Sequence, residues 1–284
     1  MRQKALGIYS AIVLAFLHAP LLILIVFSFN ASRFTVWEGF SLRWYRAAMS
    51  DPQLAEGLLN SLIIAVVAAV LSTVIGTLAA YGIWCRGAPV LPRNTRKTGR
   101  VRATLAESSL AVWRRETAPF ALSGTLYLSL VTPEIVTGVS LLALFQWAFR
   151  ILHLQLGLYT VIVAHVAFSI AYVAIVISAR LRNYDRTLEE AAMDLGAGEW
   201  HAFSRVTLPS LAPAIAAAGL LALVVSFDDY VITSLVAGVD SETLPMVIYA
   251  MARRGVSPVV NAVSALIVVV FGAIIVVSQR LQER

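Results

Sequence analysis

Six stretches of the chain are long, apolar and almost free of charged residues, and they constrain the fold more than any other feature. Crossing the roughly 30 Å hydrocarbon core of a bilayer takes about 20 apolar residues in a helix. The stretches run over Leu6–Phe29, Leu58–Trp84, Pro119–Phe149, Leu156–Ala179, Leu211–Gly238 and Val259–Ser278. Only 13% of the 284 residues are charged, against about 25% in soluble domains. The sequence predicts an all-α integral membrane protein with six transmembrane helices.

The distribution of Lys and Arg predicts how these helices are oriented. Positively charged residues are retained in cytoplasmic loops, and an even number of helices places both termini on one side. With both termini in the cytoplasm, the cytoplasmic segments hold 16 of the 22 Lys and Arg residues. The net charge of +6 then reflects topology and contact with anionic membrane lipid, not nucleic-acid binding. The first stretch is too long for a signal peptide and lacks a cleavage pattern, so we expect it to be retained.

The segment between the fourth and fifth stretches, residues 180–212, is polar and has ordered helix signals. Thr187 and Glu190 have capping-box spacing, in which the hydroxyl and the carboxylate bind amide groups at a helix start. This spacing predicts a short helix over Leu188–Leu195.

The same segment predicts a second short helix after a reversal of the chain. Gly196 and Gly198 can adopt the left-handed backbone that ends a helix. A second helix over Glu199–Val206 is expected to stop before Leu208 and Pro209, because proline cannot continue a helix. The expected result is a helical hairpin facing the cytoplasm.

Residues of this hairpin resemble the EAA signature of ABC-type importer permeases. The matching residues are Glu190, Ala191, Ala192, Gly196, Leu208 and Pro209, with Val206 in place of the usual isoleucine. Other segments resemble the spermidine/putrescine permease branch, namely Ser28–Phe34, Arg43–Tyr45, Thr132–Glu134, Phe227–Asp229, Leu244-Pro245 and Gly255–Pro258 with Asn261-Ala262. The resemblance implies a type I ABC importer permease fold. It also implies that the first hairpin helix docks into a groove on an ATPase subunit, so that closure of the ATPases moves the membrane helices.

The resemblance further implies several partners in the bacterial cytoplasmic (inner) membrane. They are a second permease subunit, two ABC ATPase subunits and an extracytoplasmic substrate-binding protein. A P-loop requires Gly-Lys followed by Ser or Thr, whereas the only lysines, Lys4 and Lys97, follow Gln3 and Arg96. We therefore expect no catalytic residue, metal or cofactor in this chain, with ATP and Mg bound by the partner ATPases. The single cysteine, Cys85, excludes an internal disulfide.

Three carboxylates interrupt the apolar stretches, namely Glu134, Asp228 and Asp229. A charge at mid-bilayer costs about 2.5–3.5 kcal/mol, so such residues normally face a cavity or a partner. Because the stretches contain no Lys or Arg, the excess negative charge suits a cationic substrate. Its ammonium groups could lie against the carboxylates and against the aromatic faces of Trp147 and Tyr230. The family resemblance implies the same substrate class, above all a polyamine.

The geometry of a helix leaves the roles of these carboxylates open. Neighbouring helical residues point about 100° apart, so Asp228 and Asp229 cannot both face a pathway unless the helix is broken there. One of them could instead bind backbone groups or the partner subunit. Glu134 follows Pro133, which tends to kink a helix, so Glu134 either lines the pathway or has a structural role at the kink.

Two other transport functions are alternatives to polyamine import by an ABC transporter. They are ABC import of another small solute, and ion-coupled secondary transport with Glu134 and Asp228 as a proton relay. A secondary transporter would not explain why the hairpin carries the EAA signature. An intramembrane aspartyl hydrolase requires two catalytic aspartates on separate elements, whereas Asp228 and Asp229 are adjacent.

The sequence predicts a division into two parts. Residues 1–55 hold the first transmembrane helix and an outer segment, and residues 56–280 hold the ABC transporter type I transmembrane domain. The second part contains the coupling loop 182–210 and a cytoplasmic insertion, 87–118, where polyamine-type permeases have a short turn. Within the insertion, capping-box spacing predicts a helix that lies on the inner leaflet or touches the ATPase, and a loop without function is the alternative.

For two further groups of residues the sequence predicts a structural role. His18 and His165 lie on apolar stretches without metal-ligand spacing, which favours packed or hydrogen-bonded histidines. Gly76, Ala79 and Ala80 are small residues that allow two membrane helices to pack closely.

Overall fold

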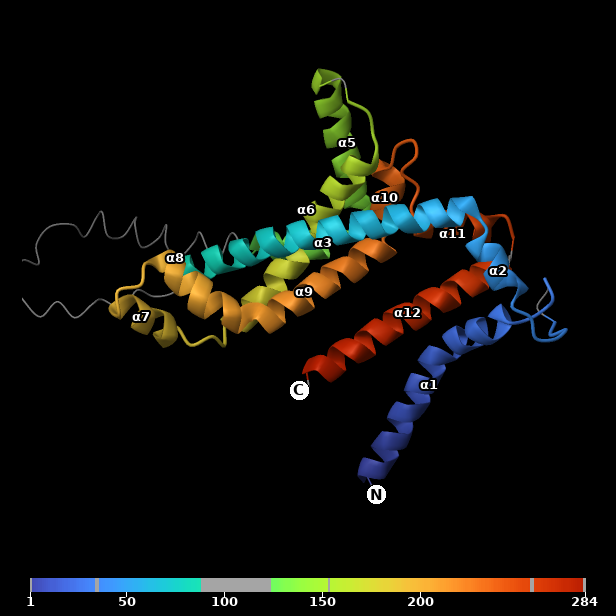
Figure 1. Ribbon diagram of the computed structural model, residues 1–284, viewed down its shortest axis with the longest axis horizontal. Coiled ribbons are helices and arrows are strands. Elements are labelled where there is room, and N and C mark those ends of the chain that lie inside the picture. Colours follow the sequence, from blue (N-terminus) through green and yellow to red (C-terminus); the bar gives the residue numbers. More distant parts are fainter. Residues whose placement is uncertain (1, 34–35, 88–123, 153, 256–257, 283–284) are drawn as a thin grey trace, which may run out of the picture. The chain divides into compact units, whose positions relative to one another are not determined.

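A computed structural model describes residues 2–33, 36–87, 124–152, 154–255 and 258–282, and these residues are organised almost entirely as helices (Figure 1). The chain divides into two compact units, one formed by Met1–Leu59 with Glu242–Arg284 and the other by Asn60–Ser241. The insertion predicted over 87–118 falls, after Gly87, outside the described residues.

The first unit combines the two ends of the chain. Its helices are α1 (Arg2–Ser28), α2 (Arg43–Met49), α11 (Leu244–Arg253) and α12 (Pro258–Gln282), together with the start of α3 (Pro52–Gly87). Helix α12 contacts both α1 and α2. The outer segment predicted after the first span contains one short helix, α2.

A buried asparagine organises the loop that joins α1 to α2. Asn30 is 1% exposed, and its side-chain amide donates to the carbonyl of Val36 at 2.8 Å. The side-chain oxygen of Asn30 accepts from the amide of Glu38 at 3.0 Å, while Trp44 Nε1 donates to the carbonyl of Asn30 at 2.8 Å. These bonds satisfy polar groups that burial would otherwise leave unpaired. The guanidinium of Arg43 lies 4.2 Å from the centre of the Trp44 ring.

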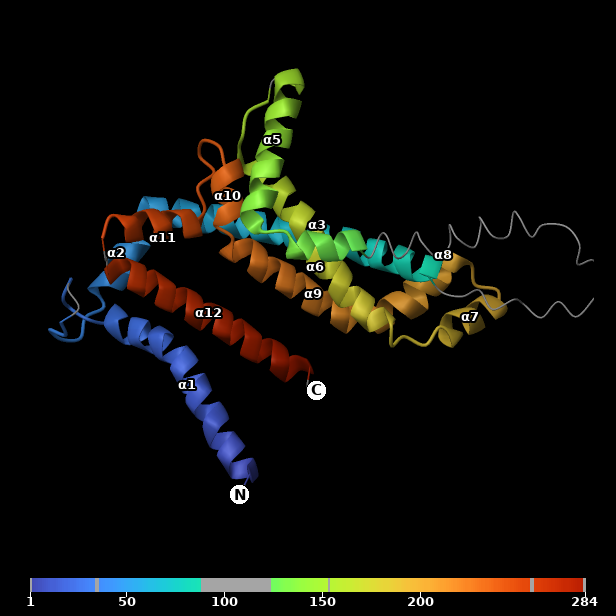
Figure 2. The same cartoon turned by 180° about the vertical axis from the view of Figure 1, so that it is seen from behind.

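The second unit contains the remaining long apolar helices and the hairpin predicted between the fourth and fifth spans. Its helices are most of α3, then α5 (Glu134–Leu152), α6 (Leu158–Leu181), α7 (Thr187–Asp194), α8 (Glu199–Ala202), α9 (Leu208–Asp228) and α10 (Val231–Val236), with a further helical stretch over 124–131. Helix α6 packs along α9, and α10 packs on α5 and α6. Figure 2 shows the same elements from behind.

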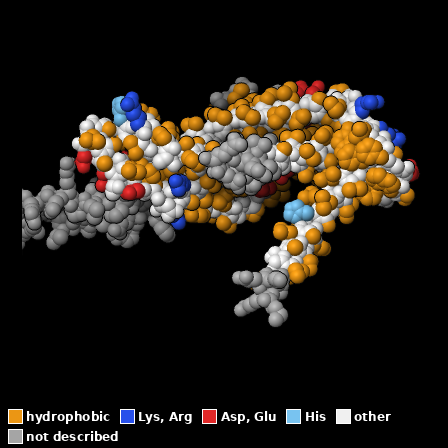
Figure 3. All heavy atoms as spheres, turned by 60° about the horizontal axis from the view of Figure 1, so that its bottom comes forward, with side chains coloured by type: hydrophobic (Ala, Val, Ile, Leu, Met, Phe, Trp, Pro, Cys, Tyr) orange, Lys and Arg blue, Asp and Glu red, His pale blue; other side chains and the backbone are white. Residues whose placement is uncertain are grey.

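Five helices within the described ranges are long and apolar enough to cross a membrane. They cover Leu6–Ser28, Pro52–Cys85, Glu134–Ile151, Leu158–Leu181 and Glu199–Asp228. Many large hydrophobic side chains on these helices are exposed, and hydrophobic atoms are spread over the described surface in Figure 3, as expected for surfaces that face lipid. The sixth span and the cytoplasmic location of both termini stay predictions.

Two of the predicted spans are interrupted. The third consists of the helical stretch 124–131 and of α5, separated at Thr132 and Pro133, and in Figure 2 the two pieces run in different directions. Proline has no amide hydrogen and restricts the residue before it, so the first helix ends there and a new one begins at Glu134. The fifth span is interrupted between Asp228 and Val231, where α9 ends and α10 begins.

The hairpin contains helix α7 where a short helix was predicted, but two details of the prediction are wrong. Thr187 does not form a capping box with Glu190, because its amide and hydroxyl both donate to Asp185, at 3.0 and 2.8 Å. These two bonds hold the pKa of Asp185 below its ordinary value. The capping interaction therefore comes from a residue two positions before the helix.

The second hairpin helix does not stop before Leu208 and Pro209. Helix α8 continues through a π-helical turn over Phe203–Thr207 directly into α9. A proline clashes with the carbonyl four residues earlier in an ordinary α-helix. The π-helical turn widens the backbone before Pro209. Its hydrogen bonds join residues that are five positions apart, instead of four as in an α-helix. The helix can therefore pass through a sequence that predicts an end.

Close packing between α3 and α6 depends on Gly76. A Cβ atom at this position would lie 2.8 Å from Cβ of Val173, which is closer than real side chains approach. We expect Gly76→Ala to lower the free energy of unfolding by about 1–3 kcal/mol, measured by thermal unfolding in detergent. Gly82 is the control on the same helix, because a Cβ there meets nothing within 4 Å. Gly82→Ala is expected to be neutral or stabilising, and an equal loss in both variants would contradict the packing role.

Candidate functional site

A polar cavity lies where the two interrupted spans meet. Its volume is about 620 Å³, and its lining includes Glu134, Asp228, Asp229 and Tyr230. This volume is in the range of small-molecule sites. Four of the five predicted pathway residues are therefore brought together at one cavity.

The breaks in the helices explain how both aspartates reach the cavity. Asp228 is the last residue of α9, and Asp229 has an extended backbone with ψ of 124°. The change of direction between them removes the 100° separation of adjacent helical residues. Glu134 is in the first turn of α5, directly after the break at Pro133. Glu134 and Asp228 are both exposed, so their carboxylates are accessible from the cavity.

Asp229 is held by protein groups, in contrast to Asp228. Its side chain is 5% exposed, and its carboxylate accepts from the amide of Ile232 at 3.3 Å and from the amide of Thr233 at 2.8 Å. The hydroxyl of Thr233 also donates to the carboxylate at 2.8 Å. Asp229 thus binds the free amide groups at the start of α10, as a capping residue does. The alternative that one aspartate binds backbone groups is confirmed for Asp229.

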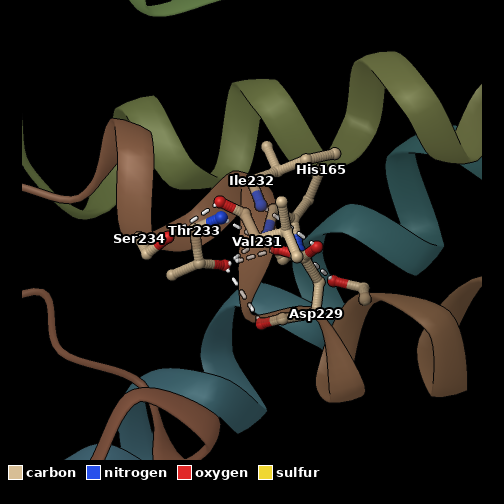
Figure 4. Close-up of polar contacts among 7 residues, drawn as sticks. His165, Asp229, Val231, Ile232, Thr233 and Ser234 are labelled. Atoms are coloured by element: carbon tan, nitrogen blue, oxygen red, sulfur yellow. Dashed lines mark hydrogen bonds and ion pairs between the residues drawn. The ribbon is translucent and has the colours of Figure 1, made fainter. Parts of the chain in front are cut away.

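His165 extends this network from α6 to the broken helix (Figure 4). Its ring is fully buried, with Nδ1 2.7 Å from Oγ of Ser226 and Nε2 2.9 Å from Oγ1 of Thr233. Nε2 also lies 3.4 Å from the Asp229 carboxylate. The predicted hydrogen-bonded histidine is confirmed, and its partners join α6, α9 and α10 at the break.

The remaining predicted pathway residue, Trp147, does not line this cavity. It lies on α5, thirteen residues after Glu134, and a helix rises about 1.5 Å per residue. Its side chain is 65% exposed. The structure therefore does not bring Trp147 together with the carboxylates.

The predicted coupling residues occupy the hairpin and its exit. Glu190 and Ala191 are exposed on α7, and Ala192 is half-buried. Gly196 follows α7 with φ of +96°, a backbone conformation that side-chain-bearing residues rarely adopt. Leu208 and Pro209 begin α9. Charged side chains gather around α7 and α8 in Figure 3, in contrast to the apolar helices.

A second cavity lies beside the contact between the hairpin and the end of α3. Its volume is about 490 Å³, and its lining includes Tyr81, Cys85, Glu189, Trp200 and Phe203. The hydroxyl of Tyr81 donates to the carboxylate of Glu189. Glu189 is 5% exposed although it belongs to a polar segment. This contact connects α3 with α7.

Sequence reasoning missed the residues that hold these two sites together. Ser226 and Thr233 lie three residues before and four residues after Asp229, so they flank the acidic pair in the sequence. That spacing is a signal for capping around a helix break, once a break is suspected. Tyr81 gives no such signal, because an aromatic residue near the end of a membrane helix is common. Among the described residues no group of His, Cys, Asp or Glu could hold a metal ion.

Comparison with known proteins identifies a family and several relatives. The family described as "Binding-protein-dependent transport system inner membrane component" matches residues 105–284. The putrescine transport system permease protein PotI of Escherichia coli K12 is 40% identical over 262 residues, covering 91% of this chain and 84% of PotI. The spermidine/putrescine transport system permease protein PotC of Haemophilus influenzae is 34% identical over 274 residues, covering 96% of this chain and 94% of PotC.

Solved structures support the same fold at lower sequence identity. A bacterial ABC transporter involved in the import of the acidic polysaccharide alginate contains a chain that aligns with a TM-score of 0.61 at 16% identity. The alignment covers 100% of this chain and 97% of that chain. A chain of the MetNI methionine ABC transporter aligns with a TM-score of 0.59 at 17% identity, covering 80% of this chain and 94% of its own.

Proposed function

This chain belongs to the family of binding-protein-dependent transport system inner membrane components, and we propose that it is the permease subunit of an ABC importer for a polyamine such as putrescine or spermidine. It is a multi-pass protein of the bacterial inner membrane. The observation that carries the substrate class is the cavity at the broken helices, where two exposed carboxylates meet Tyr230. Carboxylates and an aromatic ring are the groups that bind ammonium ions.

The roles of the two aspartates differ in this proposal. Asp228 and Glu134 face the solute as it passes, whereas Asp229 holds the start of α10 in place. This division is supported by the exposure of Asp228 and by the hydrogen bonds that Asp229 accepts from Ile232 and Thr233. A helix break that lines a cavity is tolerated in a membrane because its polar backbone groups are bound by protein or by water.

Membership of the family and the surface of the hairpin both support the proposed partners. We propose that a second permease subunit, two ATPase subunits and an extracytoplasmic binding protein complete the importer, with ATP and Mg bound by the ATPases. Leu188, Leu195 and Trp200 are 53%, 91% and 68% exposed on the hairpin. Exposed apolar side chains on a polar segment are typical of a protein contact. The residues Glu190, Ala191, Ala192 and Gly196 are proposed to form the part that an ATPase subunit binds.

Removing the exposed carboxylates tests the proposed pathway. We expect Glu134→Gln and Asp228→Asn each to lower putrescine uptake about tenfold at normal expression, because each loses a charged contact with an ammonium group. Asp240→Asn is the matched control, since Asp240 is exposed outside the cavity. Asparagine also tolerates its positive φ of 57°. Normal uptake by both cavity variants would contradict the acidic pathway.

The energy source distinguishes the importer from an ion-coupled transporter. Uptake by the complete complex is expected to stop with vanadate, which inhibits ATP hydrolysis, and to continue with a protonophore. Co-purification of an ATPase subunit with this chain would support the same conclusion. Uptake that stops with the protonophore but not with vanadate would contradict it.

A further inference from the structure

The contact between Tyr81 and Glu189 links two elements that the backbone does not join directly. Tyr81 is near the end of α3, and Glu189 is on α7. The backbone connects the hairpin directly to α6 and to α9, whereas α3 contacts it through side chains. A hydroxyl that donates to a carboxylate forms a charge-assisted hydrogen bond, which is stronger than a bond between neutral groups.

The ring of Tyr81, which carries the donor, packs against other aromatic rings. The ring centre of Tyr81 lies 4.4 Å from that of Phe203, and Phe203 lies 5.6 Å from Trp200. One turn further along α3, Trp84 lies 5.8 Å from Tyr184, and the guanidinium of Arg186 lies 5.2 Å from the centre of the Trp84 ring. The end of α3 thus contacts residues on both sides of α7 in the sequence.

Helix α3 extends from the hairpin to the core beside the acidic cavity. It contains 36 residues, with its only proline at the first position, so no interior proline kinks it. Ile64 on the same helix is 1% exposed and packs in one cluster with Phe145 and Ile232. The amide of Ile232 donates to Asp229, at the break that lines the cavity. Movement of the end of α3 can therefore reach the cavity through one continuous helix.

On the basis of the importer function proposed above, we propose that Tyr81 is a positioning residue whose hydrogen bond to Glu189 makes α3 move with the hairpin during transport. When an ATPase subunit displaces α7, the buried Glu189 carboxylate keeps the Tyr81 hydroxyl beside it. Without this bond, α6 and α9 still follow the hairpin through the backbone, whereas α3 does not. ATP hydrolysis then continues while fewer solute molecules are imported.

Two substitutions that remove the bond and one matched control test this role in the complete importer. Tyr81→Phe removes only the hydroxyl, Glu189→Leu removes the acceptor, and Glu189→Gln keeps an acceptor oxygen. The importer is reconstituted in liposomes, and the number of ATP molecules hydrolysed per putrescine imported is measured. The melting temperature and the co-purification of the ATPase subunit are measured for the same variants. We expect this ratio to rise about fivefold or more for Tyr81→Phe and Glu189→Leu, and less than twofold for Glu189→Gln.

The double variant decides whether the two residues act through one contact. Because both single substitutions remove the same bond, the Tyr81→Phe/Glu189→Leu variant is expected to be no worse than either. An unchanged ratio in Tyr81→Phe, or single effects that multiply in the double variant, would overturn the proposal. A lower melting temperature with an unchanged number of ATP molecules hydrolysed per putrescine imported would also overturn the proposal. ATP-independent putrescine import by the unsubstituted complex would contradict the importer function itself, which is a different result.

Discussion

Substitution of Gly196 by valine is expected to reduce uptake to below about one tenth while the membrane helices stay folded. Gly196 has φ of +96°, and a β-branched residue in this region costs about 1–3 kcal/mol. The chain relieves this strain by changing the turn between α7 and α8. The hairpin then presents Glu190 and Ala191 in a different position, and the ATPase subunit binds weakly. Uptake and co-purification of the ATPase subunit measure both consequences.

Gly198 is the control for this experiment, two residues further along the same turn. Its φ is −70°, which other residues adopt readily, and a Cβ there meets nothing within 4 Å. Gly198→Val is expected to keep most of the uptake. A small loss is expected because valine is less favourable than glycine at the N-cap position of a helix. Equal losses in the two variants would show that the positive φ of Gly196 is not what matters.

Replacement of Asp229 by alanine is expected to lower stability strongly, whereas the same replacement at Asp228 affects transport alone. Asp229→Ala leaves the amides of Ile232 and Thr233 without the acceptor that they have in the folded chain. It also removes the carboxylate beside the buried ring of His165. Losing a buried acceptor of this kind costs about 3 kcal/mol, which corresponds to about 6–12 °C in melting temperature.

Thermal unfolding of the two variants in detergent measures this difference. Asp228 is exposed, so Asp228→Ala is expected to change the melting temperature by less than about 2 °C while it lowers uptake. His165→Ala removes the same network from the side of α6 and should destabilise the chain as Asp229→Ala does. A stable Asp229→Ala variant would contradict the capping role of this residue.

The membrane spans and the hairpin could be predicted from the sequence because both depend on local signals. Apolar length alone identifies a helix that crosses lipid, and five such helices are present in the described residues. Pro133 marks the break before α5, because the effect of proline on a helix is local. The glycine after α7 likewise predicts the end of that helix.

The sequence left open whether the helix breaks at Asp228, and it did not predict the π-helical turn, because neither feature follows from composition alone. Phe227, Asp228 and Asp229 lie within an apolar stretch that reads as one helix. Asp229 leaves the helix where His165, sixty-four residues earlier, and Thr233 provide partners for its carboxylate. Likewise, the path through Pro209 depends on a change of helix type, for which propensity rules carry no signal. The contact between Asp229 and His165 is therefore the part of the break that local rules could not predict.

The length of α3 has a consequence for the lipid around the protein. Its 36 residues extend over about 54 Å, whereas the hydrocarbon core is about 30 Å thick. Helix α3 therefore either tilts steeply or continues past the acyl chains. Tyr81 and Trp84 are near its end, and such rings favour the level of the lipid headgroups. We therefore expect bilayer thickness to act on the same turn of α3 that contacts the hairpin, and the rate of transport to vary with acyl-chain length.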